Sequence, residues 1–172
     1  MQLSAEYAVA DVVDYLQILQ ADVDPVTNRR PTDPKLIADY NITALKRLSR
    51  ELDIPVIVIS SLNRGNYLAP VDFESFKESG AIEYTADVVI GLQLQVMHDD
   101  IFCKEGKVSE KRDRVLQAKK ETPRKIELVC LKNRYGAPSF NVKFAYYAQH
   151  DYYAEETVQG DNNEVTTPRV RY

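Results

Sequence analysis

Two short runs of apolar residues flank a long segment with helical periodicity, and this arrangement constrains the fold most. The first run, Ala8 to Val13, ends at Asp14, and the second covers Val56 to Ile59. Short apolar runs rich in valine or isoleucine are typical of buried strands in a parallel sheet, which is covered on both faces. A helix between them supplies the crossover that parallel strands need. The pattern predicts an α/β fold with a mostly parallel sheet.

The helix is expected to start with Asp33 as N-cap and Pro34 at its first position, and to end before Pro55. Later in the chain, Phe73 to Glu83 predicts a short helix and turn broken at Gly80. Three further apolar runs predict strands, and the last two flank a polar turn, which indicates an antiparallel hairpin. These runs are Val88 to Leu92, Ile126 to Leu131 and Phe140 to Tyr147.

The charge balance excludes a globally basic nucleic-acid-binding protein. The 172 residues carry 22 Lys and Arg against 26 Asp and Glu, a formal net charge of −4. A polar insertion at about residues 97–125 departs from this balance, since residues 104–125 hold nine basic and four acidic side chains. The interspersed acids favour a solvated or amphipathic segment over an added nucleic-acid contact.

Three features that are absent from the sequence predict its compartment: a membrane-spanning apolar run, a signal peptide and a set of cysteines for disulfides. No apolar run approaches the ~20 residues of a membrane span, and the N-terminus has no signal-peptide pattern. Two cysteines cannot build a disulfide scaffold, so a cytoplasmic protein without a membrane partner is expected. We expect one domain over residues 1–150 and a polar, disordered tail over residues 151–172.

Four segments that follow one another along the chain carry a family resemblance. They are residues 12–19 (VVDYLQIL), 45–64 (LKRLSRELDIPVIVISSLNR), 77–89 (KESGAIEYTADVV) and 132–138 (KNRYGAP). In sequence and in order they resemble the Walker B, sensor, DNA-loop and arginine-finger segments of DnaB-type replicative helicases. The resemblance covers about residues 8–147 and implies a RecA-like ATPase fold of the P-loop NTPase type.

The resemblance assigns the Walker B aspartate to Asp14, which would help to hold Mg²⁺ indirectly beside ATP. A strand-end carboxylate can orient the waters of a magnesium ion, although most strand-end aspartates form turns or caps. Ser61, Asn63 and Arg64 fall in the sensor segment. Ser61 stands where the family usually has a glutamine, whose side chain is longer.

Two further groups take their expected roles from the same resemblance. Lys77, Glu78 and Gly80 match the loop that holds the phosphates of single-stranded DNA; lysine supplies charge, and glycine permits close backbone approach. Lys132 and Arg134 match the pair that reaches the γ-phosphate of a neighbouring subunit's ATP. Without the resemblance, the first group would be interpreted as a solvated turn and the second as a basic tip of a hairpin.

The phosphate-binding motif G-x-x-x-x-G-K-S/T does not occur in the 172 residues. The resemblance places this Walker A loop upstream in sequence, on a strand between the Val56 and Val88 runs. We therefore expect a truncated RecA-like domain with a gap in its sheet and no ATPase activity alone. Its partners would be further copies, or a ring of helicase subunits that carry Walker A.

The implied parent activity is ATP-driven, 5′–3′-type translocation of a hexameric ring on single-stranded DNA during replication, with ATP and Mg²⁺ as cofactors. One alternative is a non-catalytic DNA-binding or assembly protein derived from a helicase. Another is a RecA-like ATPase outside replication. A weaker candidate is a metal site at His98, Asp99, Asp100 and Cys103, although an acidic loop with one histidine is usually solvated. Another is base stacking by Tyr146, Tyr147, Tyr152 and Tyr153, although tyrosines at strand ends are more often packing residues.

Overall fold

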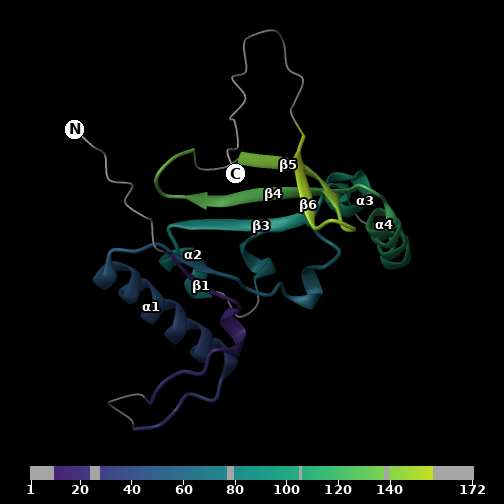
Figure 1. Cartoon of the computed structure of the whole chain (residues 1–172). Helices are drawn as coiled ribbons and strands as arrows, with labels where there is room; N and C mark the ends of the chain where they lie inside the picture. Colours follow the sequence, from purple (N-terminus) through teal and green to yellow (C-terminus); the bar gives the residue numbers. More distant parts are fainter. Residues whose placement is uncertain (1–9, 24–27, 77–79, 105, 138–139, 157–172) are drawn as a thin grey trace, which may run out of the picture.

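Two separate sheets organise the chain in the computed structural model, which describes residues 10–23, 28–76, 80–104, 106–137 and 140–156 (Figure 1). The smaller sheet pairs β1 (Asp11–Val13) with β2 (Val56–Val58) in parallel. The larger sheet is antiparallel, in the order β3 (Val88–Leu94), β4 (Arg124–Asn133), β5 (Phe140–Tyr147) and β6 (Tyr152–Glu155). The predicted α/β class is confirmed, but the antiparallel part extends beyond the expected hairpin to four strands.

The long helix α1 (Pro34–Leu52) forms as predicted. The carboxylate of Asp33 accepts hydrogen bonds from the backbone N–H groups of Lys35 (2.8 Å) and Leu36 (3.1 Å), and Asp53 ends the helix with a positive φ of 52°. The shorter helices are η1 (Leu16–Ile18), η2 (Arg64–Asn66), η3 (Phe73–Ser75), α2 (Gly80–Thr85), η4 (Gln95–His98), α3 (Asp100–Cys103) and α4 (Val108–Lys120). Gly80 is the first described residue of α2, and residues 77–79 before it lie outside the described part, so the expected break at Gly80 stays a prediction. Within the described ranges, no helix is long and apolar enough to cross a membrane.

One buried hydrophobic cluster connects the two sheets. Leu16, which follows β1, is 1% exposed and packs with Val89 of β3. The other buried members come from α1, α2 and the segment before α2: Ala38, Ile42, Phe76 and Ile82. The helices therefore hold the small parallel sheet against the first strand of the antiparallel sheet.

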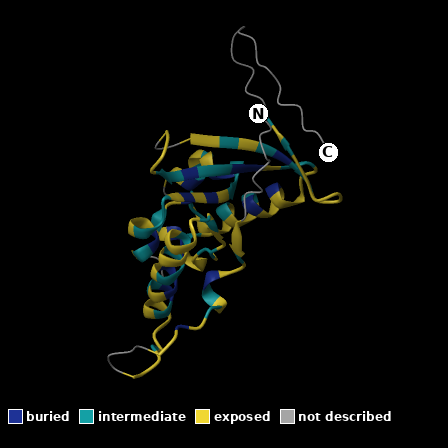
Figure 2. Cartoon of the chain, turned by 60° about the vertical axis from the view of Figure 1, so that its left-hand side comes forward, coloured by how far each residue is buried: buried dark blue, intermediate teal, exposed yellow. Residues whose placement is uncertain are grey.

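The prediction that the first two strands are buried is wrong. Val12 is 63% exposed and Ile57 is 55% exposed. Among the described strands, β2 pairs on one edge only, with β1, and β3 likewise pairs only with β4. A parallel strand becomes buried when strands flank it and helices cover both faces, and the small sheet lacks that cover. Figure 2 accordingly shows exposed positions along much of α1 and the small sheet.

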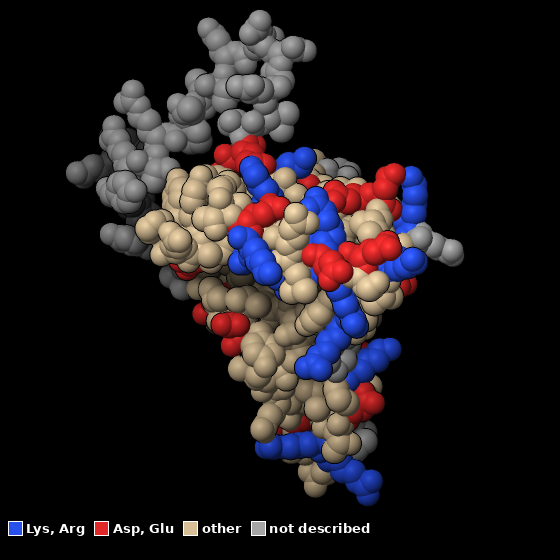
Figure 3. All heavy atoms as spheres, turned by 90° about the vertical axis from the view of Figure 1, so that its right-hand side faces the viewer, with Lys and Arg blue, Asp and Glu red and all other residues tan. Residues whose placement is uncertain are grey.

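The insertion at residues 97–125 is more ordered than a solvated segment. η4, α3 and α4 enclose a second cluster at one end of the large sheet, formed by Val96, Met97, Phe102, Val115 and Ala118. The outer surface of this end mixes basic and acidic side chains (Figure 3). An amphipathic segment was one of the two expected forms, and on the face that Figure 3 shows, basic side chains alternate with acidic ones.

The tail predicted from Asp151 onward begins too early. Residues 152–155 form β6, which pairs with β5 and extends the large sheet by one strand. Asp151 has a positive φ of 48° in the turn between them. Tyrosines in this segment, which favour strand formation, explain the difference. Residues 157–172 lie outside the described part of the chain.

The N-cap of α1 gives a direct test of the helix boundary. Replacing Asp33→Ala removes the acceptor for two N–H groups and should lower the free energy of unfolding by about 1 kcal/mol. Urea denaturation followed by circular dichroism measures this change. Asp22→Ala is the matched control, since among the described residues the Asp22 carboxylate accepts from the adjacent Val23 N–H in a loop and caps no helix; an equal loss in both variants would contradict the cap.

Candidate functional site

The carboxyl ends of β1 and β2 lie at one edge of the small sheet and bring Asp14 and Ser61 to the same region. The strands are parallel, with Val13 opposite Val58, and the Ile59 N–H donates to the Val13 carbonyl at 2.9 Å. Asp14 follows β1 as an exposed residue. This placement is the one expected for ligand-binding residues at the carboxyl ends of parallel strands.

Gln17 links the two segments, a contact that the sequence analysis missed. Its side-chain amide donates to Ser60 Oγ at 2.9 Å, and its Oε1 accepts from the Ser61 backbone N–H at 3.1 Å. The segment after β1 is thus bonded directly to the segment after β2. A polar residue three positions after the strand-end aspartate was the available signal.

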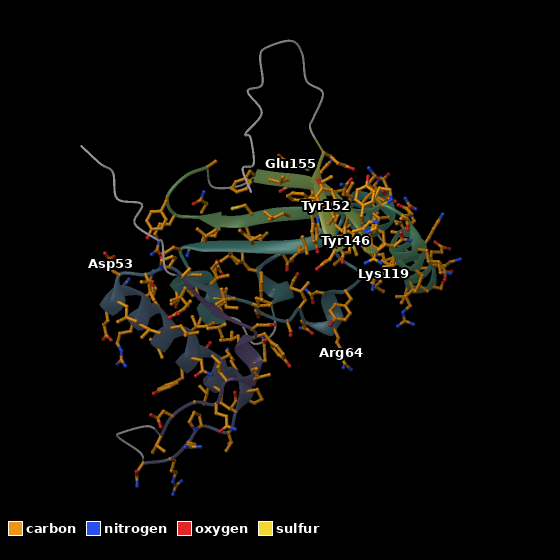
Figure 4. All side chains as sticks on the ribbon, in the orientation of Figure 1. Asp53, Arg64, Lys119, Tyr146, Tyr152 and Glu155 are labelled. Carbon is orange, nitrogen blue, oxygen red and sulfur yellow. The ribbon has the colours of Figure 1, made fainter. Side chains whose placement is uncertain are left out.

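The other two sensor-segment residues lie away from this bridge. Asn63 caps η2, where its Oδ1 accepts from the Gly65 N–H at 3.1 Å. Arg64 is exposed, and its side chain projects away from the large sheet (Figure 4). The structure therefore does not bring Ser61, Asn63 and Arg64 together as one group.

The DNA-loop segment is described in part. Lys77 and Glu78 lie outside the described residues. Gly80 is exposed and is the first residue of α2. A Cβ at this position would meet only Lys35 Cε, at 3.9 Å, so neighbouring atoms do not require glycine here.

Lys132 and Arg134 lie together at the end of β4, against α2 and the start of β3. Lys132 Nζ donates to the backbone carbonyl of Glu83, and Arg134 Nη1 pairs with Asp87 Oδ1 at 2.7 Å. The Arg134 N–H also donates to the Asp87 carbonyl at 2.9 Å. A register shift in β4 opposite Val89 precedes Lys132, and such bulges commonly redirect the side chains that follow.

Asp87 is a second residue that sequence analysis did not single out. Its carboxylate pairs with Lys46 of α1 as well as with Arg134. The hydrogen bond from Lys46 is the largest cause that holds the pKa of Asp87 below its ordinary value, and the charges of Lys46 and Arg134 act in the same direction. Desolvation opposes this shift and is the smaller effect.

An apolar groove of about 440 Å³ runs between the two sheets. β2 contributes Val56 to Val58 and β3 contributes Val88 to Ile90, so both unpaired strand edges face the same space. Leu16 and Phe76 also line it, and Lys46 and Asp87 lie at its margin. The groove occupies the place where the resemblance predicts a gap in the sheet.

Mg²⁺ and ATP place different requirements on the residues of this site. Within the described ranges, no group of three His, Cys, Asp or Glu could hold a metal ion directly. The exposed Asp14 carboxylate suits a contact through a metal-bound water, which is how magnesium is often held in proteins. The backbone cradle for phosphates is not in this sequence, so the fit extends to Mg²⁺ through Asp14 and not to the whole nucleotide.

The two weaker candidates have structural roles. His98 pairs with Glu127, which is 1% exposed on β4. Tyr146 stacks on Tyr153 with ring centroids 4.4 Å apart and donates its hydroxyl to Asp151 at 3.0 Å. Figure 4 shows Tyr146 and Tyr152 at the same end of the large sheet. The contact between Tyr146 and Tyr153 is the packing expected of strand-end tyrosines, whereas His98 is paired with a buried carboxylate rather than simply solvated.

The sequence model of the family described as "DnaB-like helicase C terminal domain" matches residues 4–155. This chain belongs to that family. It is 31% identical over 160 residues to the replicative DNA helicase DnaB of Helicobacter pylori strain J99, which covers 78% of this chain and 32% of the relative. It is 29% identical over 144 residues to the replicative DNA helicase DnaC of Bacillus subtilis strain 168, with 81% and 26% covered. The chain thus spans about a third or less of these relatives.

Two solved structures support the fold. One, described as an ATPase domain, superposes with a TM-score of 0.64 at 21% identity, covering 90% of this chain and 46% of that one. The other, a DnaB-like replicative helicase whose structure was described together with its interactions with primase, gives a TM-score of 0.62 at 21% identity and covers 87% and 30%. The predicted RecA-like fold of a DnaB-type domain is confirmed.

The ion pairs of Asp87 predict an acid-sensitive contribution to the stability of this DnaB-type domain. Because the folded-state pKa of Asp87 lies below its unfolded value, the contribution is complete above the unfolded pKa and is lost as pH falls through the folded one. Unfolding free energies measured from about pH 6 downward should fall less steeply below about pH 4 in Asp87→Asn than in the unmodified chain.

Lys46→Met tests whether the hydrogen bond from Lys46 is the main cause of the lowered pKa of Asp87. Removing the Lys46 ammonium should raise the Asp87 pKa toward its ordinary value, which ¹³C NMR of the Asp87 carboxyl group measures. Arg47→Met, one residue away and paired with Glu51 on the exposed side of α1, should leave it unchanged. An Asp87 titration that is the same in all three proteins would contradict the assignment.

Proposed function

We propose that this chain supplies the arginine-finger and DNA-contacting elements of a DnaB-like, ATP-driven helicase ring on single-stranded DNA. The observation that carries the proposal is the separation of its polar groups. Asp14 and Ser61 follow β1 and β2, whereas Lys132 and Arg134 lie against α2 and the start of β3. A subunit that acts on its own nucleotide at one place and on a neighbour's at another requires two such sites.

The finger role rests on the chemistry of the turn after β4. Arg134 is a permanent cation whose side chain is 45% exposed, so it can contact a phosphate on another subunit. Lys132, two residues earlier, adds a second cation close by. A guanidinium placed at a γ-phosphate neutralises charge that develops during transfer, an effect worth about 10³–10⁵ in rate.

Asp14 has the complementary role at the other site. ATP with Mg²⁺ supplies the free energy for movement when it is bound there. The Asp14 carboxylate would orient a metal-bound water, and the Gln17 bridge fixes the segment that carries it against Ser60 and Ser61. Without the Walker A loop, the 172 residues alone are not expected to hydrolyse ATP.

The groove between β2 and β3 supports a partner that provides a strand. Two unpaired edges with apolar side chains match the requirements of one extended segment, which would hydrogen-bond on both sides. In the family resemblance, this segment is the strand before the Walker A loop. The ring would therefore include polypeptide that carries Walker A, with single-stranded DNA as its substrate.

A second candidate function uses the same surfaces without nucleotide chemistry. On this alternative, the chain is a non-catalytic DNA-binding or assembly protein derived from a helicase. Both functions use the same finger turn and DNA loop. ATP turnover in the presence of Walker A subunits distinguishes them, because only the first predicts that Arg134→Ala abolishes turnover.

Single-stranded DNA binding tests the loop assignment. Fluorescence anisotropy with a labelled oligonucleotide should show affinity that falls with salt, and Lys77→Ala should weaken binding and reduce the salt slope by about 0.7. Lys104→Ala is the control, because Lys104 is an exposed lysine that already pairs with Asp100. No binding up to about 100 μM would contradict a working loop in this chain and favour the assembly function.

The open strand edges predict association in solution. At micromolar concentration, light scattering should give a mass above the 19.6 kDa of one chain. Ile57→Lys places a charge at an unpaired strand edge and should shift the protein toward the monomer. Leu116→Lys on α4 is the matched control, since Leu116 and Ile57 are both 55% exposed. A monodisperse monomer of the unmodified chain would contradict this prediction.

A further inference from the structure

Asp87 is the point at which three elements meet. Its carboxylate pairs with Lys46 of α1 and with Arg134 after β4, and its backbone carbonyl accepts the Arg134 N–H. Asp87 itself lies between the end of α2 at Thr85 and the start of β3 at Val88. A change in the position of any of these elements therefore reaches Arg134 through one residue.

Lys132 makes a second connection between the same elements. Its ammonium donates to the backbone carbonyl of Glu83, in the last turn of α2. Carbonyls at a helix C-terminus lack partners within the helix and carry partial negative charge, so a lysine is a favourable partner. Gly80 opens this helix and Glu83 lies one turn later, so α2 is the physical link between the loop glycine and the finger turn.

We propose that Asp87 is a positioning residue that couples the DNA-loop helix α2 to the finger residues Lys132 and Arg134. The inference rests on the proposed function for the two ends of this link. Asp87 engages Nη1 of Arg134, and the side chain remains 45% exposed, so other N–H groups of the guanidinium stay accessible to a phosphate. The Asp87 carboxylate thus fixes the direction of the Arg134 side chain while leaving other guanidinium N–H donors unoccupied.

The contacts that make this link do not involve Ser61, although the Asn63 N–H donates to the Ser75 carbonyl at 2.7 Å, just before α2. Ser61 bonds to Gln17 through its backbone, at the edge formed by β1 and β2. Lys46, Asp87, Arg134, Lys132 and Glu83 form their contacts without residues from that edge. Movement of α2 on DNA binding shifts the Glu83 carbonyl and Asp87, and with them both finger cations, whatever side chain stands at position 61.

The link is tested first without DNA, by amide hydrogen exchange. In Arg134→Gln, the amides of Tyr84 to Ala86 should exchange about fivefold or more faster, because Asp87 loses its ion pair with the finger turn and keeps only the backbone hydrogen bond. The same substitution should add little when Asp87→Asn is already present, since both substitutions remove the same carboxylate–guanidinium pair. Additive effects of the two substitutions, or unchanged exchange in α2, would overturn the proposal.

Asp99→Asn is the matched control. Asp99 pairs with Arg114 at 2.8 Å, as Asp87 pairs with Arg134 at 2.7 Å, but the Asp99–Arg114 pair joins α4 to the residue between η4 and α3. Asp99→Asn should leave exchange in α2 unchanged. Circular dichroism and thermal melting establish that each variant is folded, and Lys132→Gln, which leaves Asp87 intact, must also speed exchange in α2.

DNA affinity then separates the coupling from a simple effect of charge. Loss of the coupling should lower the affinity, whereas loss of a negative charge should raise it. Both Asp→Asn variants remove one negative charge, which by long-range electrostatics raises affinity for a polyanion. We expect Asp99→Asn to bind a labelled oligo-dT as tightly as the unmodified chain or more tightly, and Asp87→Asn to bind about three- to tenfold more weakly. Equal or tighter binding by Asp87→Asn would overturn the coupling. If the unmodified chain binds no DNA, the proposed function fails, and the exchange measurements still decide the link.

Discussion

The burial of Leu16 among side chains of α1, α2 and β3 is the interaction on which the rest of the structure depends. The described strands β2 and β3 share no ladder, so hydrophobic packing rather than backbone hydrogen bonding holds the two sheets together. Hydrophobic packing holds the two sheets at a fixed distance from each other, but it provides no hydrogen-bond partners for the strand edges. The groove between the sheets, the exposure of β2 and the proposal of a strand-donating partner all follow from that condition.

Local signals predicted much of the fold. The cap at Asp33, the helix to Leu52 and the antiparallel pairing of β4 with β5 depend on residues close in sequence, and the structure has all three. The burial of β1 and β2 was predicted wrongly because the burial of a strand depends on the strands and helices that flank it. The amino-acid composition of the strand itself does not reveal those neighbours. β6 was missed because a four-residue strand next to a polar segment gives a weak periodic signal.

The candidate site shows the same division. The segment that resembles the arginine-finger turn pointed to Lys132 and Arg134, and both residues lie together at the end of β4. Their partners were not predictable, since Asp87 meets Lys46 across 41 positions and Arg134 across 47. Charged residues are common on any surface, and a sequence alone does not show which two will pair. Gln17 was missed for a related reason: its importance lies in reaching a neighbouring strand.

The long antiparallel ladder has a mechanical consequence. β4 is bonded to β3 over Ile126–Asn133 and to β5 over Arg124–Cys130, whereas β1 meets β2 over three residues. A force applied along β4 loads many hydrogen bonds in shear at the same moment, so the strand resists sliding. The short parallel pair has few bonds to share such a load. A pull on the turn after β4 is therefore resisted along the whole length of the large sheet, whereas the three-residue parallel pair would separate under a smaller load.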